Sequence, residues 1–219
     1  MTRGTAIIIG VGPGLGLALA RTFSDAGHDI ALLARSTDKL NTYAAQLETS
    51  AVQVRGYAVD AADLAALRAA LSTAFADLGA PDVLVYNAAV LREDTPTDGD
   101  DEGWANALAV DVLGAKVAAE TVLPALRDGR GSLLFTGGGF ALAPSPQFAS
   151  VSVGKAALRA YATALHSQQH DTDVHVTSVT IAGSIGGGEA RFAPDAIART
   201  YLELHRQPRS EWTSELLLD

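Results

Sequence analysis

The chain has 219 residues, of which 48% are hydrophobic and 19% charged, a balance that excludes disorder and indicates one globular domain over residues 1–219. Its formal net charge of −9 disfavours nucleic acid or an anionic membrane as a partner. The absence of cysteine excludes disulfides, thiol chemistry and thiolate metal sites. No apolar run approaches the roughly 20 residues that span a bilayer, and no signal peptide is recognisable, so we expect a cytoplasmic protein.

The first half of the chain alternates between short apolar runs and segments with helical spacing. Residues 6–9 form a continuous apolar run, as in a strand that is buried on both faces. Residues 15–26 follow with helical spacing and end at a glycine, a common helix terminator. The same patterns predict strands at 29–34, 52–59 and 83–86 and helices at 37–48 and 63–78.

The second half continues this alternation after an acidic loop at residues 93–102. The patterns predict a long helix at 104–126, a strand at 132–136, a helix at 150–169 and a strand at 174–181. A glycine-rich loop at 183–188, a last helix at 195–205 and a short edge strand at 215–218 complete the chain. Regular alternation of this kind predicts an α/β fold of the Rossmann type, a doubly wound parallel sheet with helices on both faces.

Glycines separate the first predicted strand from the first predicted helix. Gly10, Gly14 and Gly16 surround the junction, and Leu15 begins the helix. A strand that enters a helix through glycines presents backbone N–H groups and a positive helix end to a pyrophosphate. The alternative is an ordinary tight turn, which three glycines at this spacing in this architecture disfavour. We therefore expect a bound dinucleotide.

This glycine spacing, together with Lys155 at the head of a later helix, resembles the short-chain dehydrogenase/reductase family. Asp60 matches the acidic residue that contacts adenine in that family, and Asn87 with Ala88 matches its Asn-Ala-Gly segment. Either match alone is weak, because Asp or Asn at a strand end is usually a turn former. The resemblance also implies contact with the nicotinamide for two residues of the later glycine-rich loop, Gly183 and Ile185.

The residues after the second predicted strand bear on the choice of cofactor. A carboxylate there would bond the ribose 2′-hydroxyl and repel a 2′-phosphate. This chain has Arg35 and Ser36 instead, and its first acidic residue is Asp38. A guanidinium beside a hydroxyl suits a phosphate, so we expect NADP(H) rather than NAD(H). The alternative is a surface arginine that covers the neighbouring helix.

The catalytic positions depart from the family pattern. Lys155 matches the lysine that binds the nicotinamide ribose, but the tyrosine, serine and asparagine positions hold Val151, Gly138 and Asp111. The resemblance therefore implies an atypical member that lacks the usual proton donor, and general acid catalysis contributes about 10²–10⁴-fold in rate. Two interpretations remain open. The chain is an atypical oxidoreductase of an unknown small molecule, or it is a catalytically silent cofactor-binding protein, such as a redox sensor or a partner subunit.

Several side chains could replace the missing acid. Ser152, next to Val151, is the best of them and joins Lys155 and Asp111 as a candidate catalytic residue. The other candidates are Ser150, Thr136, Tyr86 and His166. Each of the five is more often a structural residue than a catalytic one.

Small residues on two predicted helices suggest self-association. In the family the equivalent helices pack across a two-fold axis, which implies a homodimer or homotetramer. Small side chains permit close approach, and the two helices carry several: Ala115, Ala118, Ala119, Ala157, Ala160 and Ala164.

Overall fold

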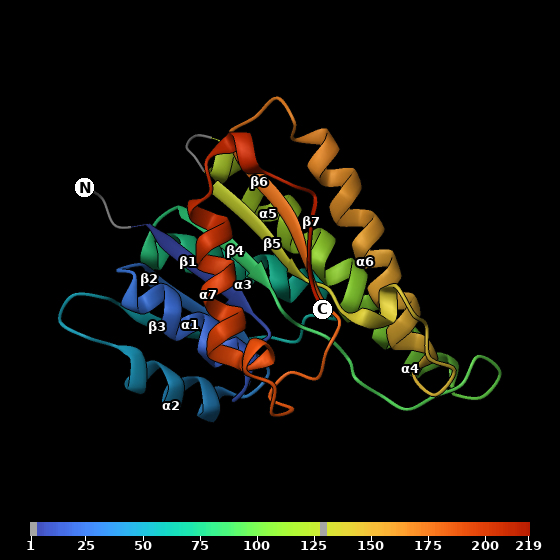
Figure 1. The fold of residues 1–219 in the computed structure, drawn as a ribbon. Helices are drawn as coiled ribbons and strands as arrows, with labels where there is room; N and C mark the ends of the chain where they lie inside the picture. The colour runs from blue at the N-terminus through green and yellow to red at the C-terminus, as the bar shows by residue number, and fades with distance from the viewer. Residues whose placement is uncertain (1–3, 128–130) are drawn as a thin grey trace.

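The computed structural model describes residues 4–127 and 131–219, and within them contains one sheet of seven parallel strands (Figure 1). The strands are β1 Thr5–Ile9, β2 Asp29–Ala34, β3 Val54–Ala58, β4 Pro81–Tyr86, β5 Gly131–Thr136, β6 Val174–Ile181 and β7 Glu215–Leu218. Their order is β3-β2-β1-β4-β5-β6-β7, so the direction of winding reverses between β1 and β4. The predicted doubly wound sheet is confirmed, and such sheets bind ligands where the winding reverses.

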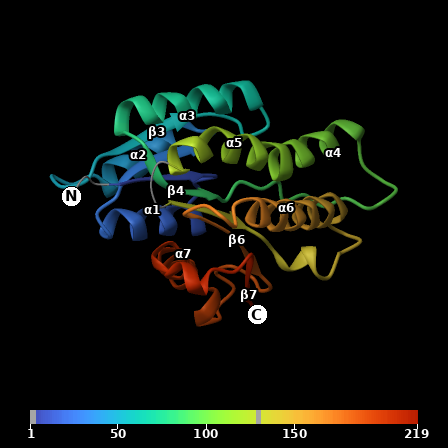
Figure 2. The ribbon, with the colours of Figure 1, turned by 90° about the horizontal axis from the view of Figure 1, so that it is seen from above.

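Helices cover both faces of the sheet. They are α1 Leu15–Asp25, α2 Thr37–Leu47, α3 Leu64–Leu78, α4 Asp101–Leu108, α5 Ala115–Arg127, α6 Ala149–Gln168 and α7 Pro194–Arg206. Figure 2 shows α1 and α7 on one side of the sheet and α3 and α5 on the other. Alternate strand residues enter the two cores: Ile8 packs with α1, α2 and α7, whereas Ile7 and Ile9 pack with α3, α5 and α6. Coverage on both faces explains why β1 is buried throughout and apolar from Ala6 to Ile9.

The long helix expected at residues 104–126 is interrupted. A segment of π-helix, η1 Ala109–Gly114, joins α4 to α5, and α4 begins earlier than expected because Asp100 accepts a hydrogen bond from the backbone of Gly103. The buried Tyr86 hydroxyl donates to the carbonyl of Val110 at 2.5 Å and lies against Gly114, where a Cβ would come within 2.3 Å of it. This contact from β4 is invisible to sequence periodicity, and π segments of this kind often occur at functional sites.

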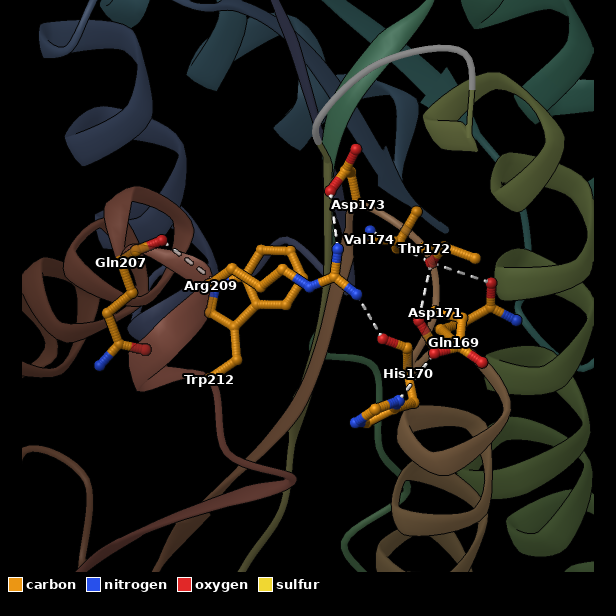
Figure 3. A network of polar contacts seen from close by, with 9 residues as sticks. All are labelled: Gln169, His170, Asp171, Thr172, Asp173, Val174, Gln207, Arg209 and Trp212. Carbon is orange, nitrogen blue, oxygen red and sulfur yellow. Dashed lines mark hydrogen bonds and ion pairs between the residues drawn. The ribbon is translucent and has the colours of Figure 1, made fainter.

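The C-terminal segment is fastened to the turn between α6 and β6 (Figure 3). Arg209 donates to the carbonyl of His170 at 2.7 Å and to the Asp173 carboxylate at 3.2 Å. The Trp212 indole donates to the carbonyl of Gln207 at 3.1 Å, and its ring stacks on His175 with centroids 4.9 Å apart. These contacts hold the chain that leads into β7 at the edge of the sheet.

The small residues on α5 do not form an outer surface. Ala115, Ala118 and Ala119 are at most 1% exposed and belong to the core between α5 and the sheet, so the expectation that they permit close approach of a partner is wrong. On α6, by contrast, Ala160 and Ala164 are exposed. Within residues 4–127 and 131–219, no helix combines the length and apolarity needed to cross a bilayer.

Candidate dinucleotide and catalytic site

The glycine loop after β1 divides into packed and open positions. Gly10 has a φ of +89°, and a Cβ there would lie 2.4 Å from the backbone nitrogen of Ala88. A Cβ on Gly16 would lie 2.6 Å from the carbonyl oxygen of Gly10. Both positions therefore require glycine for close packing. Gly12 and Gly14 differ, because a Cβ on either would meet nothing within 4 Å.

The open side of this loop adjoins the N-terminus of α1. Gly14 precedes Leu15, the first residue of α1, and no side chain caps this helix end. The N–H groups in the first turn of a helix lack intrahelical partners, and the helix dipole makes this end positive. An uncapped helix end beside two open glycines fits a pyrophosphate.

Asn87 holds the ends of three strands together beside this loop. Its Nδ2 donates to the carbonyl of Gly10 at 2.9 Å, and its backbone nitrogen donates to the carbonyl of Ile9 at 2.8 Å. The backbone nitrogen of Gly10 in turn donates to the carbonyl of Leu33 on β2 at 2.9 Å. The carboxyl ends of β1, β2 and β4 therefore form one rigid edge.

Arg35 and Ser36 follow β2 at the same edge. Arg35 is exposed, and no acidic residue of the described chain lies within ion-pair distance of it. The Ser36 hydroxyl oxygen accepts a hydrogen bond from the backbone nitrogen of Lys39 at 3.4 Å and so caps α2. Asp60 is exposed after β3, and its carboxylate accepts from the backbone nitrogen of Ala62 at 2.9 Å, as in an ordinary Asx turn.

Lys155 places a buried ammonium group at the carboxyl end of β5. The residue is 8% exposed, and its Nζ donates to the carbonyl of Thr136 at 2.8 Å. The hydroxyl groups of Thr136 and Tyr201 lie 2.8 Å apart, so α7 supports this strand end from the opposite face. Burial lowers the pKa of Lys155, and the nearby Asp111 carboxylate opposes that shift.

Asp111 lies in η1 and is fully buried. Its Oδ1 accepts from the backbone nitrogen of Val90 at 3.0 Å, whereas its Oδ2 has no hydrogen-bond partner among the described residues. A Cβ on Gly154 would lie 2.6 Å from this Oδ2, so only glycine allows the carboxyl group to approach α6. Burial raises the pKa of Asp111 to about 6, although Lys155 and the Val90 amide both lower it.

Gly138 and Val151 offer no proton donor at the two positions expected beside the lysine. A Cβ on Gly138 would have the Lys155 stem as its nearest neighbour, at 3.8–3.9 Å, so this position opens onto the lysine. Val151 lies one helical turn before Lys155 on α6 and is 3% exposed. Neither side chain can give or take a proton.

Ser152 has its hydroxyl group engaged elsewhere. It donates to the carbonyl of Phe148 at 2.8 Å and accepts from the backbone nitrogen of Ser145 at 3.0 Å. These bonds fasten the loop that precedes α6, so the geometry does not favour Ser152 as a proton donor toward the space at Lys155.

The other four candidate acids also have partners or neighbours within the fold. Tyr86 donates to a carbonyl of η1, Thr136 pairs with Tyr201, and a ring nitrogen of His166 lies 2.8 Å from the carbonyl oxygen of Val176. The backbone nitrogen of Ser150 donates to the Asp94 carboxylate at 2.9 Å, whereas the buried Ser150 hydroxyl makes no hydrogen bond among the described residues. Asp94 was not among the expected site residues, because it lies in a loop and its capping of α6 depends on contact between distant segments.

The loop after β6 carries the two residues expected at the nicotinamide. A Cβ on Gly183 would lie 2.1 Å from the Phe192 ring, so glycine is required for that ring to pack. The backbone nitrogen of Gly186 donates to the carbonyl of Phe192 at 2.9 Å and closes the loop. Ile185 is 42% exposed, and Gly139 packs against the start of the same loop at Ala182.

Comparisons with known proteins agree with this geometry. A family model described as short chain dehydrogenase matches residues 4–185. A short chain dehydrogenase of Pseudocercospora fijiensis is 28% identical over 230 residues, which cover 98% of this chain and 72% of that protein.

Solved structures show the same fold. A metagenomic short-chain oxidoreductase in complex with NADP has a TM-score of 0.89 and 24% identity, covering 98% of this chain and 96% of that one. An NADPH-bound short chain oxidoreductase from Pseudomonas aeruginosa PAO1, said to contain an atypical catalytic center, has a TM-score of 0.86 and 20% identity, covering 98% and 95%. The family match extends over most of the chain, from the strand before the glycine loop to the loop after β6, and this chain belongs to the short-chain dehydrogenase/reductase family.

Proposed function

We propose that the chain is an NADP(H)-dependent oxidoreductase that acts on a small molecule. The observation that carries this proposal is the open glycine cradle of Gly12 and Gly14 at one end of the site, with the solvent-facing Arg35 at the same sheet edge. The cradle suits a pyrophosphate, and a guanidinium with no neighbouring carboxylate suits a 2′-phosphate. The metagenomic and Pseudomonas structures with NADP and NADPH support the same cofactor.

Lys155 is the proposed proton donor. A bound nicotinamide supplies or accepts the hydride. When a carbonyl carbon receives a hydride, its oxygen becomes an alkoxide that needs a proton. The Lys155 stem lies beside Gly138, its ammonium group donates to the carbonyl of Thr136, and its lowered pKa makes a proton easier to give. The resulting amine regains a proton from water, and Asp111 favours the return to the charged form.

A catalytically silent cofactor-binding protein is the competing function. It is favoured by Val151, which offers no proton, and by Ser152, whose hydroxyl proton is committed to a backbone carbonyl. Such a chain would bind NADPH and act as a redox sensor or as a partner subunit.

Turnover of NADPH with a panel of ketones and enones separates the two functions. We expect measurable oxidation of NADPH, highest with enones, because an activated C=C bond depends least on an acid. Lys155→Met should reduce turnover by about 10²-fold, the lower end of the usual contribution of an acid. Ser152→Ala is the matched control and should leave turnover unchanged, because its hydroxyl serves the backbone. Normal binding of NADPH with no turnover of any acceptor would establish the silent function.

Restoring the family's acid provides a second test. Gly138→Ser with Val151→Tyr should raise ketone reduction by about tenfold or more. The serine has room beside Lys155, whereas the tyrosine must displace a buried valine, so NADPH binding is measured in the same variant. If binding is normal and ketone reduction does not rise, the absence of these two groups does not limit the reaction.

A homodimer or homotetramer is also proposed. The exposed face of α6 carries Val153, Ala156, Ala160 and Ala164, whose small or apolar side chains allow a second copy of the helix to approach closely. The face of α5 that carries Ala115 is excluded from this contact, because it packs on the sheet.

A further inference from the structure

Two histidines and an aspartate converge at the amino ends of the strands, opposite the proposed dinucleotide site. His28 precedes β2, Asp82 is the second residue of β4, and His205 lies in the last turn of α7. One ligand atom from each lies within 4.8 Å of the other two. We propose that His28, Asp82 and His205 form a binding site for a divalent transition metal of the zinc type.

A buried nitrogen of His28 and a buried oxygen of Asp82 face each other without a hydrogen bond among the described residues. His28 Nδ1 and Asp82 Oδ1 are 3.3 Å apart, yet both atoms are buried and neither makes a hydrogen bond within the described chain. Asp82 Oδ2 lies 4.0 Å from His205 Nε2, so each carboxylate oxygen faces one imidazole. Buried polar atoms normally have partners, and a cation between these groups would satisfy them.

The spacing suits zinc. Bonds of about 2.0–2.2 Å to nitrogen and oxygen in a tetrahedral site place ligand atoms about 3.4 Å apart. The pair from His28 and Asp82 is already at this separation, and the others need only a small rotation of a side chain. Two imidazoles with one carboxylate leave a fourth position for water. Mg²⁺ and Ca²⁺ prefer all-oxygen sites, so this donor set selects against them.

The surroundings orient the ligands. The Ser132 hydroxyl lies 2.9 Å from His205 Nδ1, which directs Nε2 toward Asp82, and metal-binding histidines usually have such a hydrogen bond at the nitrogen that does not bind the metal. The buried Phe23 ring contacts both imidazoles edge-on, with centroids 5.5 and 6.0 Å from His28 and His205. Because the three ligands come from separate elements, a bound metal would fasten α7 to the sheet and to the turn after α1.

Zinc binding is measured on the full chain, without an affinity tag, after treatment with EDTA and desalting. We expect one Zn²⁺ per chain in competition with a chromophoric chelator. The melting temperature should rise by about 5–10 °C when free Zn²⁺ exceeds the dissociation constant 100-fold. Mg²⁺ should give neither effect.

Variants distinguish the cluster from chance binding. Asp82→Asn, which preserves the shape of the side chain, and His28→Gln should each weaken Zn²⁺ binding by about 100-fold or more, since even residues that only hydrogen-bond to a metal ligand contribute about 10–100-fold. His170→Gln is the matched control and should have no effect, because that imidazole is 79% exposed and lies outside the cluster. Co²⁺ bound to the unaltered chain should show the intense visible bands of a tetrahedral site, a measurement independent of variant folding. Substoichiometric Zn²⁺, or equal affinity in Asp82→Asn, would overturn the proposal, and neither result bears on NADPH turnover.

Discussion

Replacing Asp111 by asparagine should alter the dependence of stability on pH. Asp111 is fully buried, and its folded-state pKa is raised from 3.8 to about 6. The folded state binds this proton more tightly than the unfolded state does. The protonated carboxyl group therefore contributes to the free energy of unfolding, fully below pH 3.8, and this contribution is lost as the pH rises through about 6. Asparagine has the same shape, keeps an acceptor for the Val90 amide and cannot ionise.

The magnitude follows from the two pKa values of the Asp111 carboxyl group. Relative to the protonated group, ionisation costs the folded state about 1.5 kcal/mol at pH 5 and about 3 kcal/mol at pH 8. Between pH 5 and pH 8 the parent therefore loses about 1.5 kcal/mol of stability that Asp111→Asn keeps. This loss corresponds to about 3–6 °C in the melting temperature of a domain of this size.

The assay is thermal unfolding of the parent and the variant at pH 5 and pH 8, at equal ionic strength. The melting temperature of Asp111→Asn minus that of the parent should be about 3–6 °C more favourable at pH 8 than at pH 5. Asp111→Ala serves as a control that removes the charge but leaves a cavity, and it should show the same pH trend from a lower melting temperature. A difference that is constant with pH, or that favours the parent at pH 8, would show that Asp111 is ionised and stabilised by Lys155.

Three further predictions concern the cofactor, the sheet edge and assembly. The parent should bind NADPH more tightly than NADH, and Arg35→Asp should reverse this order; calorimetry that finds NADH equal or better with the parent would contradict the cofactor assignment. Glu215 accepts hydrogen bonds from Arg159 at 2.6 and 2.7 Å and from Thr180 at 2.6 Å. Glu215→Gln should therefore lower the melting temperature by about 2–4 °C. An unchanged melting temperature would mean that solvent screens the partly exposed pair of Glu215 and Arg159. Light scattering at micromolar concentration should give a multiple of the 22.6 kDa chain mass for the parent. Ala160→Glu should lower the measured mass to that of the monomer. A monomeric parent would exclude the contact through α6.

Much of the fold could be predicted from the sequence because its determinants are local. Apolar runs marked the strands, and the bounds at residues 29–34, 174–181 and 215–218 agree with β2, β6 and β7. The turn glycine Gly10, which the structure shows at positive φ, was recognisable because no other residue adopts that conformation easily beside a strand. The parallel sheet with helices on both faces followed from the regular alternation of strands and helices.

Only the tertiary structure decided the contacts between distant segments. The π-helix that carries Asp111 depends on a hydroxyl from β4, and the bonds of Ser152 depend on how its loop folds back on α6. Likewise, no spacing in the sequence relates His28 to His205, which meet because β2 and β4 begin, and α7 ends, at the same edge of the molecule. Periodicity records which face of an element is buried, whereas the partner at that face is set by sheet order and packing. The roles proposed for Lys155 and for the cluster of His28, Asp82 and His205 both depend on those partners.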